Sequence, residues 1–391
     1  MYRSLVFICL CVVFLCSSCG QRAPVHDSRF QTEDYLIDYD VSPEYVNAEG
    51  TFCRYESTYY DIIGQWILYY DAAGGQWDKL CGKAECSHED KSCNAFVDPL
   101  TFGIQIYDHK LYWLSGSVLY CADLDGSHRE QVQQLGNMDG LNPRFYIHRG
   151  YVYTSRIGTE MSDGANAYTV EVMRYELGQA ETTEKCIYKE YFEYLPMYFC
   201  RFDGNQMYIL VDVPQGMYGK AEKCMRNLYA YDISEQQIEQ IWSTEESWSA
   251  NNIQIRDHEI YFLDLRLDFL STEGGIVRYS QFDPAMRTMR NGEEIALEPG
   301  ALGAYMVDGY LITSCYTADP EERYDRYWVY AEDHALVGTG SITHYAMPIG
   351  KDEMGILMSA GGLAGGQLLR IPFADLDSPE VLLDFQDERI P

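Results

Sequence analysis

Short apolar runs that end at an acidic residue or a glycine recur along most of the chain. Seven such runs are spaced 41 to 56 residues apart, and they begin at Leu68, Leu119, Val172, Leu228, Val277, Trp328 and Leu369. A second apolar run follows each of them within about ten residues. Two alternating runs around an Asp or Gly turn are typical of a β-hairpin, so the pattern predicts seven hairpins.

A second repeat lies upstream of each hairpin. The segment 108–114, DHKLYWL, recurs at 257–263 as DHEIYFL, and looser copies begin at Arg149, Asp203 and Asp308. Each copy couples a turn pair to a strand rich in Tyr and β-branched residues, which assigns His109 and His258 a turn role. Every unit of about fifty residues therefore holds about four short strands, and no long stretch shows the 3.6-residue period of a helix.

These repeats predict an all-β fold over residues 51–391, namely a β-propeller of four-stranded blades. Seven blades fit the spacing best. Six or eight blades are alternatives, because the first unit has a weak pair of inner strands and the preceding segment could add a closing strand. An array of β-sandwiches with chance Asp-Gly turns is the competing fold.

The clearest unit carries a family resemblance. Residues 111–114, LYWL, followed by 118–129, VLYCADLDGSHR, resemble the YWTD-type propeller repeat, from which Leu114 and Ser115 depart. Similar repeats occur in TolB-like propellers and in surface lipoproteins of Gram-positive bacteria without assigned activity. The resemblance implies binding of a protein or other ligand at a propeller face, and it carries over no catalytic residue.

The first 50 residues read as targeting and tether segments. Arg3 precedes an apolar run at 5–15, which as a helix would rise only about 16 Å and cannot span a bilayer. The sequence Cys16-Ser17-Ser18-Cys19 resembles a bacterial lipobox, although Cys16 stands where Leu is preferred. We expect residues 1–18 to be a signal peptide, Cys19 to carry the lipid and residues 19–50 to form a flexible tether. An ordinary secretory signal is the alternative.

One local cluster has metal-binding chemistry. Cys81, Cys86, His88 and Cys93 fall within thirteen residues, between the first and second units. Their thiolate and imidazole groups suit a structural zinc or iron ion. Because the protein is expected to be exported, a disulfide between two of the three cysteines is an alternative, and free thiols are another. The cluster should join the outermost strand of one blade to the innermost strand of the next, on a propeller face.

Charge and missing motifs narrow the function. The chain has 29 Lys and Arg against 60 Asp and Glu, a formal net charge of −31, and no basic run, which excludes nucleic-acid binding and leaves the lipid as its only membrane contact. The 34 Tyr residues are mostly strand builders. Because no nucleophile elbow, zinc-protease helix or P-loop occurs, we expect a monomeric, non-enzymatic surface protein that binds a protein, peptide or glycan. A glycosidase or lyase on the same scaffold is the alternative.

Overall fold

The computed structural model describes residues 52–386, with gaps at 163–164, 180–183, 217–222, 267–274, 299–302, 308, 316–324, 332–333, 343–345 and 363–364. All of these residues belong to one compact unit, Tyr35–Pro391. The predicted signal peptide, Cys19 and the tether lie outside the described residues. Within the described part of the chain, no helix has the length and apolarity needed to cross a membrane.

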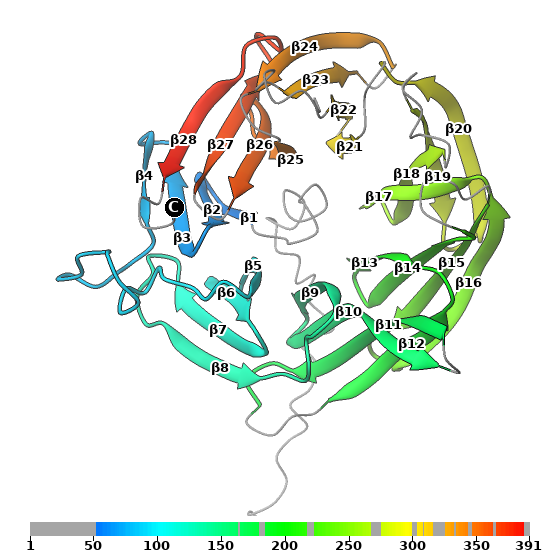
Figure 1. The fold of residues 1–391 in the computed structure, drawn as a ribbon, viewed down its shortest axis with the longest axis horizontal. Helices are drawn as coiled ribbons and strands as arrows, with labels where there is room; N and C mark the ends of the chain where they lie inside the picture. Colours follow the sequence, from blue (N-terminus) through cyan, green and yellow to red (C-terminus); the bar gives the residue numbers. More distant parts are fainter. Residues whose placement is uncertain are drawn as a thin grey trace, which may run out of the picture. The chain divides into compact units, whose positions relative to one another are not determined.

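Twenty-eight described strands form seven antiparallel sheets of four strands each, arranged as a β-propeller (Figure 1). In every sheet, four strands that are consecutive in sequence pair in order from the inner to the outer edge of the ring. This confirms the propeller and the count of seven blades. The seven apolar runs recognised in the sequence are the third strands of the seven blades.

Blade 1 consists of β1 (Phe52–Tyr55), β2 (Thr58–Ile63), β3 (Trp66–Asp71) and β4 (Gln76–Lys79), and blade 2 of β5 (Thr101–Tyr107), β6 (Lys110–Ser115), β7 (Val118–Asp123) and β8 (Glu130–Gln134). Blade 3 consists of β9 (Leu141–His148), β10 (Tyr151–Ser162), β11 (Ala165–Glu176) and β12 (Lys185–Phe192). Blade 4 consists of β13 (Met197–Asp203), β14 (Gln206–Pro214), β15 (Cys224–Asp232) and β16 (Gln237–Glu246). Blade 5 consists of β17 (Trp248–Arg256), β18 (Glu259–Arg266), β19 (Ile276–Asp283) and β20 (Thr288–Ala296). Blade 6 consists of β21 (Gly303–Val307), β22 (Tyr310–Cys315), β23 (Asp325–Tyr330) and β24 (Leu336–Ile342), and blade 7 of β25 (Met347–Lys351), β26 (Gly355–Gly362), β27 (Gly365–Pro372) and β28 (Glu380–Gln386).

The repeated Asp-His pairs form tight turns between the first two strands of blades 2 and 5. Asp108 and His109 both have positive φ, 47° and 58°, and Asp257 and His258 have 49° and 65°. Two consecutive left-handed residues are the requirement of a two-residue type I′ hairpin turn, whose twist matches that of the flanking strands. The turn role assigned to both histidines is therefore confirmed.

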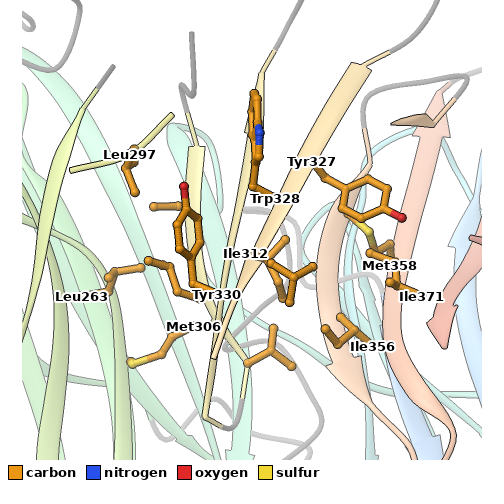
Figure 2. Close-up of a cluster of buried hydrophobic side chains, with 14 of the residues drawn as sticks. Leu263, Leu297, Met306, Ile312, Tyr327, Trp328, Tyr330, Ile356, Met358 and Ile371 are labelled. Atoms are coloured by element: carbon orange, nitrogen blue, oxygen red, sulfur yellow. The ribbon is translucent and has the colours of Figure 1, made fainter. Parts of the chain in front are cut away.

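Blades pack face to face through apolar side chains. Figure 2 shows this for blade 6, where Met306 and Tyr330 lie on the side of Leu263 in blade 5, while Ile312 lies on the side of Ile356 in blade 7. All five belong to one buried cluster. Alternate side chains of each strand therefore bury against different neighbours, which explains why these strands are apolar on both faces.

Blade 7 meets blade 1 without sharing a strand, because both described sheets are complete by themselves. The Tyr59 hydroxyl donates to Asp352 Oδ2 at 2.9 Å, and the Ser359 hydroxyl donates to Asp61 Oδ2 at 2.9 Å. Apolar side chains of both blades form one buried cluster around these bonds. The ring is therefore closed by side-chain contacts between the first and last blades.

Candidate metal centre and binding face

The four predicted metal ligands lie in the connection between β4 and β5, residues 80–100. As predicted, this segment leads from the outermost strand of blade 1 to the innermost strand of blade 2. It projects at the outer edge of the ring (Figure 1). The cluster is thus peripheral, between two blades, and does not lie over the centre of the propeller.

Backbone hydrogen bonds hold this connection against both blades. Ile67 N–H donates to Ala95 O at 2.8 Å, and Ile67 O accepts from Leu80 N–H at 2.9 Å, so one residue of blade 1 binds both ends of the loop. On the side of blade 2, Asn94 Nδ2 donates to Gly126 O at 2.8 Å. Gly126 has a φ of 77°, and a Cβ there would lie 2.6 Å from the Leu80 carbonyl oxygen. The close approach therefore requires glycine.

The loop brings the four ligand atoms together. The Sγ atoms of Cys81, Cys86 and Cys93 and a ring nitrogen of His88 all lie within 4.8 Å of one another, and His88 Nδ1 is 3.4 Å from Cys93 Sγ. A tetrahedral zinc site with its usual bond lengths needs nitrogen–sulfur separations of about 3.6 Å. The arrangement is close to what a metal ion would require.

Hydrogen bonds to sulfur distinguish two of the thiols. The backbone N–H groups of Lys83 and Asn94 donate to Cys81 Sγ, and that of Ala95 donates to Cys93 Sγ. Burial raises the pKa of Cys93 to about 12, and the neighbouring thiols act in the same direction. Burial also acts to raise the pKa of Cys81, but its hydrogen bonds outweigh that effect and lower it. Of these two thiols, Cys81 is therefore the one that loses its proton more readily.

The donor set fits a structural zinc ion. Cys81, Cys86 and Cys93 are free thiols in the structure, so no disulfide joins the three cysteines of the loop. Three thiolates and one imidazole complete a tetrahedron and leave no position open for a substrate. Such a centre would carry one net negative charge, and Lys79 Nζ, which donates to His88 O at 2.7 Å, lies beside it. The residues that could hold the ion are Cys81, Cys86, His88 and Cys93.

In blade 3, the two middle strands β10 and β11 extend beyond the flanking strands β9 and β12 at one end. β10 pairs with β9 only from Tyr151 to Ile157, whereas its pairing with β11 continues to Ser162. The described arms of the β10–β11 hairpin, residues 158–162 and 165–169, therefore project past the innermost strand of their own blade. β12 ends beside this hairpin, because Phe192 pairs with Tyr168.

Exposed apolar side chains gather at the same end of blade 3. Tyr191, Tyr194 and Leu195 are 54%, 37% and 44% exposed, in β12 and in the connection that leads to β13. Aromatic side chains that remain in water next to a projecting hairpin are typical of a recognition surface. We call Tyr191, Tyr194, Leu195 and the hairpin arms 158–162 and 165–169 the blade 3 surface.

A buried ionic network between blades 4 and 5 escaped the sequence analysis. Arg226, fully buried, lies 3.3 Å from Asp212, 2.9 Å from Glu246 and 2.9 Å from Asp264. Burial alone would lower the pKa of Arg226, but the three carboxylates outweigh it and raise it. Glu246 and Asp264 also pair with Arg278, at 2.6 and 3.1 Å. These residues come from separate strands in two blades, so no local motif signals them.

No family model matches the chain, and no curated protein matches it. Among solved structures, it is similar to the acylaminoacyl peptidase of Pyrococcus horikoshii, with a TM-score of 0.50 and 10% identity over 85% of this chain, and it spans 52% of the peptidase. It is also similar to the nidogen/laminin complex, with a TM-score of 0.40 and 8% identity over 72% of this chain and 92% of that one. An uncharacterised protein of Listeria monocytogenes has a TM-score of 0.39 and 10% identity over 73% of this chain and 84% of its own. At 10% identity the similarity to the peptidase shows a shared fold, and function does not follow from it.

Proposed function

We propose that the mature protein is a monomeric, non-enzymatic binding protein anchored outside the bacterial cell by a lipid on Cys19. In this proposal the propeller presents the blade 3 surface to a protein, peptide or glycan. The observation that carries the proposal is the projecting hairpin beside the exposed Tyr191 and Tyr194. Rigid strands that support a projecting element with exposed aromatic groups suit recognition.

Glycan and peptide arrays probed with the mature chain test the binding role. We expect a ligand whose signal falls at least tenfold in the double variant Tyr191→Ser/Tyr194→Ser. The matched control is Met286→Ser, which removes a 71% exposed side chain from the turn between β19 and β20. Equal losses in both variants would contradict the assignment of the surface. Release of cleaved glycan during the assay would instead support a glycosidase or lyase.

The lipid anchor is tested on the full chain in its bacterial host. We expect the wild-type chain to partition with membranes and to carry a diacylated residue at position 19 by mass spectrometry. Cys19→Ala should abolish the modification, while Cys16→Ala should leave it in place. Release of an unmodified wild-type protein into the medium would show an ordinary secretory signal instead.

We further propose that the loop cluster holds a structural zinc ion. The support is the convergence of four soft donors within 4.8 Å, with N–H groups already bonded to two of the sulfurs. Elemental analysis should find about one zinc per chain, and a chelator should lower the melting temperature. Cys93→Ser should remove the metal, whereas Cys186→Ser, at an exposed free thiol in β12, should retain it. A loop disulfide in the native protein would refute this site.

A further inference from the structure

The connections that lead into the innermost strands of blades 2, 3 and 4 share a short sequence pattern. Each contains an acidic residue, any residue and then leucine, as Asp98-Pro99-Leu100, Asp139-Gly140-Leu141 and Glu193-Tyr194-Leu195. Leu100 directly precedes β5, Leu141 is the first residue of β9, and Leu195 stands two residues before the start of β13. The pattern therefore occupies equivalent places in three consecutive blades.

The three leucines lie on one face of the propeller. Each blade pairs four consecutive strands in order, so all innermost strands begin on the same face of the ring. β5, β9 and β13 follow one another along its inner edge (Figure 1). The Tyr198 hydroxyl of blade 4 donates to Asn142 O at 2.6 Å, directly after Leu141. The second strand of a blade runs back to this face, so the arms of the β10–β11 hairpin reach it as well.

The side chains of these leucines face water. Leu100, Leu141 and Leu195 are 65%, 45% and 44% exposed, and the exposed Tyr191 and Tyr194 precede Leu195 in the chain. The other large apolar side chains that the described structure exposes lie on outermost strands or in turns of the opposite face, and these are Trp77, Ile238, Met286, Leu336, Val337, Met354 and Val381. On this face, the exposed apolar groups of the described residues are thus confined to one sector, which indicates an interaction site.

A fourth copy of the pattern is part of the protein core. Glu246-Ser247-Trp248 leads into β17 with the same spacing. Trp248 is 5% exposed and its ring centre lies 4.4 Å from the guanidinium of Arg278, while Glu246 pairs with Arg226 and Arg278 at 2.9 and 2.6 Å. In the other three copies, packing does not account for the apolar residue. A single exposed leucine needs no explanation, but three at equivalent positions do.

The charges of this sector define the kind of partner that fits it. Asp98, Asp139 and Glu193 are all exposed. No Lys or Arg lies within two positions of any of the three leucines. Apolar groups set among negative charges complement a segment in which apolar residues alternate with Lys or Arg. Aliphatic side chains lack the flat aromatic surface on which a sugar ring packs, so a peptide fits the leucines better than a glycan.

We propose that Leu100, Leu141 and Leu195, with the acidic residue two positions before each, form a docking rim for a basic, apolar-rich segment of a partner protein. The apolar residues of that segment bury the leucines, and its Lys or Arg side chains pair with the three carboxylates. The inference rests on the binding role proposed above and narrows the partner to a protein segment. It also extends the recognition face from blade 3 to the adjoining ends of blades 2 and 4.

The test uses the mature chain and an array of synthetic peptides in which Lys or Arg alternates with Leu or Phe. One matched set has Glu in place of the cations, and a second has Ser in place of the apolar residues. We expect saturable binding of the first set alone, and weaker binding at higher salt because ions screen the charge pairs. The proposal is wrong if no peptide of the first set binds more tightly than its matched counterparts.

Two leucines that lie outside the blade 3 surface provide the sharpest variant. Leu100→Ser and Leu141→Ser should each weaken peptide binding about fivefold, because each loses the burial of one partly exposed side chain. The double variant should weaken it about 25-fold, since the two sites lie in different blades. The matched control is Leu336→Ser, at a 46% exposed position of β24, which should bind within about twofold of the wild type.

Neutral substitutions test the charges of the docking rim. The triple variant Asp98→Asn/Asp139→Asn/Glu193→Gln should bind more weakly and lose most of the salt dependence. Its matched control neutralises three exposed glutamates elsewhere, in Glu235→Gln/Glu293→Gln/Glu353→Gln. Equal effects of rim and control variants would refute the docking rim, because they would show general attraction to an acidic protein.

The outcomes separate the docking rim from the blade 3 surface. A glycan or peptide whose binding is lost in Tyr191→Ser/Tyr194→Ser, but kept in Leu100→Ser/Leu141→Ser, would refute the docking rim and leave the proposed binding role intact. Loss of peptide binding in the leucine variant, with the melting temperature unchanged, would support the docking rim even if the tyrosine variant binds normally.

Discussion

His148, the last residue of β9, is an imidazole kept neutral by its surroundings. Its Nε2–H donates to Gly204 O at 2.8 Å, and its ring lies 4.7 Å from that of Phe202. Burial lowers its pKa to about 4, and the hydrogen bond to Gly204 only partly opposes this. Protonation of His148 therefore destabilises the folded state.

This predicts an acid-sensitive contribution to stability. Above pH 6.5, His148 is neutral in both the folded and the unfolded chain, so its contribution is fully present. As the pH falls from 6.5 to 4, the unfolded chain takes up a proton that the folded chain does not, and about 3 kcal/mol is lost. In urea unfolding at several pH values, His148→Gln should flatten the dependence in this range. His128→Gln, at an exposed imidazole, should not, and equal curves for wild type and His148→Gln would contradict the prediction.

Arg226 illustrates the opposite case, a buried charge that is fully paired. Arg226→Met would leave the fully buried Asp212 without its cation and would leave the fully buried Asp264 with Arg278 alone. Removing one partner from such a network typically destabilises a protein by about 3–5 kcal/mol. Chemical denaturation should show this loss. The control is Arg287→Met, which breaks the exposed pair with Glu239 and should leave the denaturation midpoint almost unchanged; similar midpoints in both variants would argue against the network.

Among the elements, the hairpin of β10 and β11 allows binding to be tested apart from the stability of the fold. Beyond Ile157, β10 pairs with β11 alone, so the projecting part contributes little to the blade. Replacing residues 160–167 by Asn-Gly would join Thr159 to Tyr168 through a two-residue turn and keep the pairing of Tyr168 with Phe192 of β12. We expect the near-UV circular dichroism and the melting temperature to change little, while array binding is lost. A collapse of the melting temperature would show that the projection supports the fold.

The elements also show which features a sequence can reveal. Two-residue turns need positive φ, so pairs such as Asp108-His109 mark the strand boundaries, and the cluster at 81–93 was visible because its four ligands are close in sequence. Arg226 and its carboxylate partners gave no such signal. Asp264 lies in blade 5 and Arg226 in blade 4, and only the packing of one blade on the next brings them together. Which residues of two neighbouring blades contact each other depends on which faces of their sheets meet. A local sequence pattern does not reveal this.

In the molecule as a whole, acidic residues are distributed unevenly between the inner and the outer strands. The innermost strands are depleted of acidic residues, whereas outer strands such as β16 and β20 carry several glutamates. With a formal charge of −31, repulsion is smallest when acidic groups spread over the periphery, where water screens them. The inner edge then becomes the least acidic part of the propeller.

The closure of the ring is the other property of the whole molecule. Six of the seven pairs of neighbouring blades are also connected covalently, because the chain continues from one blade to the next. Among the described residues, blades 7 and 1 are joined only through side-chain contacts. Asp352 is central to this junction. Its carboxylate accepts hydrogen bonds from Tyr59, from Arg370 at 2.6 Å and from the backbone N–H groups of Met354 and Gly355. Burial acts to raise the pKa of Asp352, but these partners lower it, so the group stays ionised.

Loss of one hydrogen bond at this junction should therefore destabilise two blades that are far apart in sequence. Tyr59→Phe removes only the bond to Asp352 and should cost about 1 kcal/mol. Because no covalent link holds blade 7 against blade 1, we expect hydrogen exchange measured by mass spectrometry to accelerate in both blades and to stay unchanged in blade 4. The matched control is Tyr60→Phe, which removes the bond from Tyr60 to Leu124 O between blades 1 and 2. These two blades are consecutive in the chain, so faster exchange should stay local to them. If Tyr59→Phe accelerates exchange in blade 1 alone, or uniformly around the ring, the junction between the first and last blades is not the place where the propeller opens.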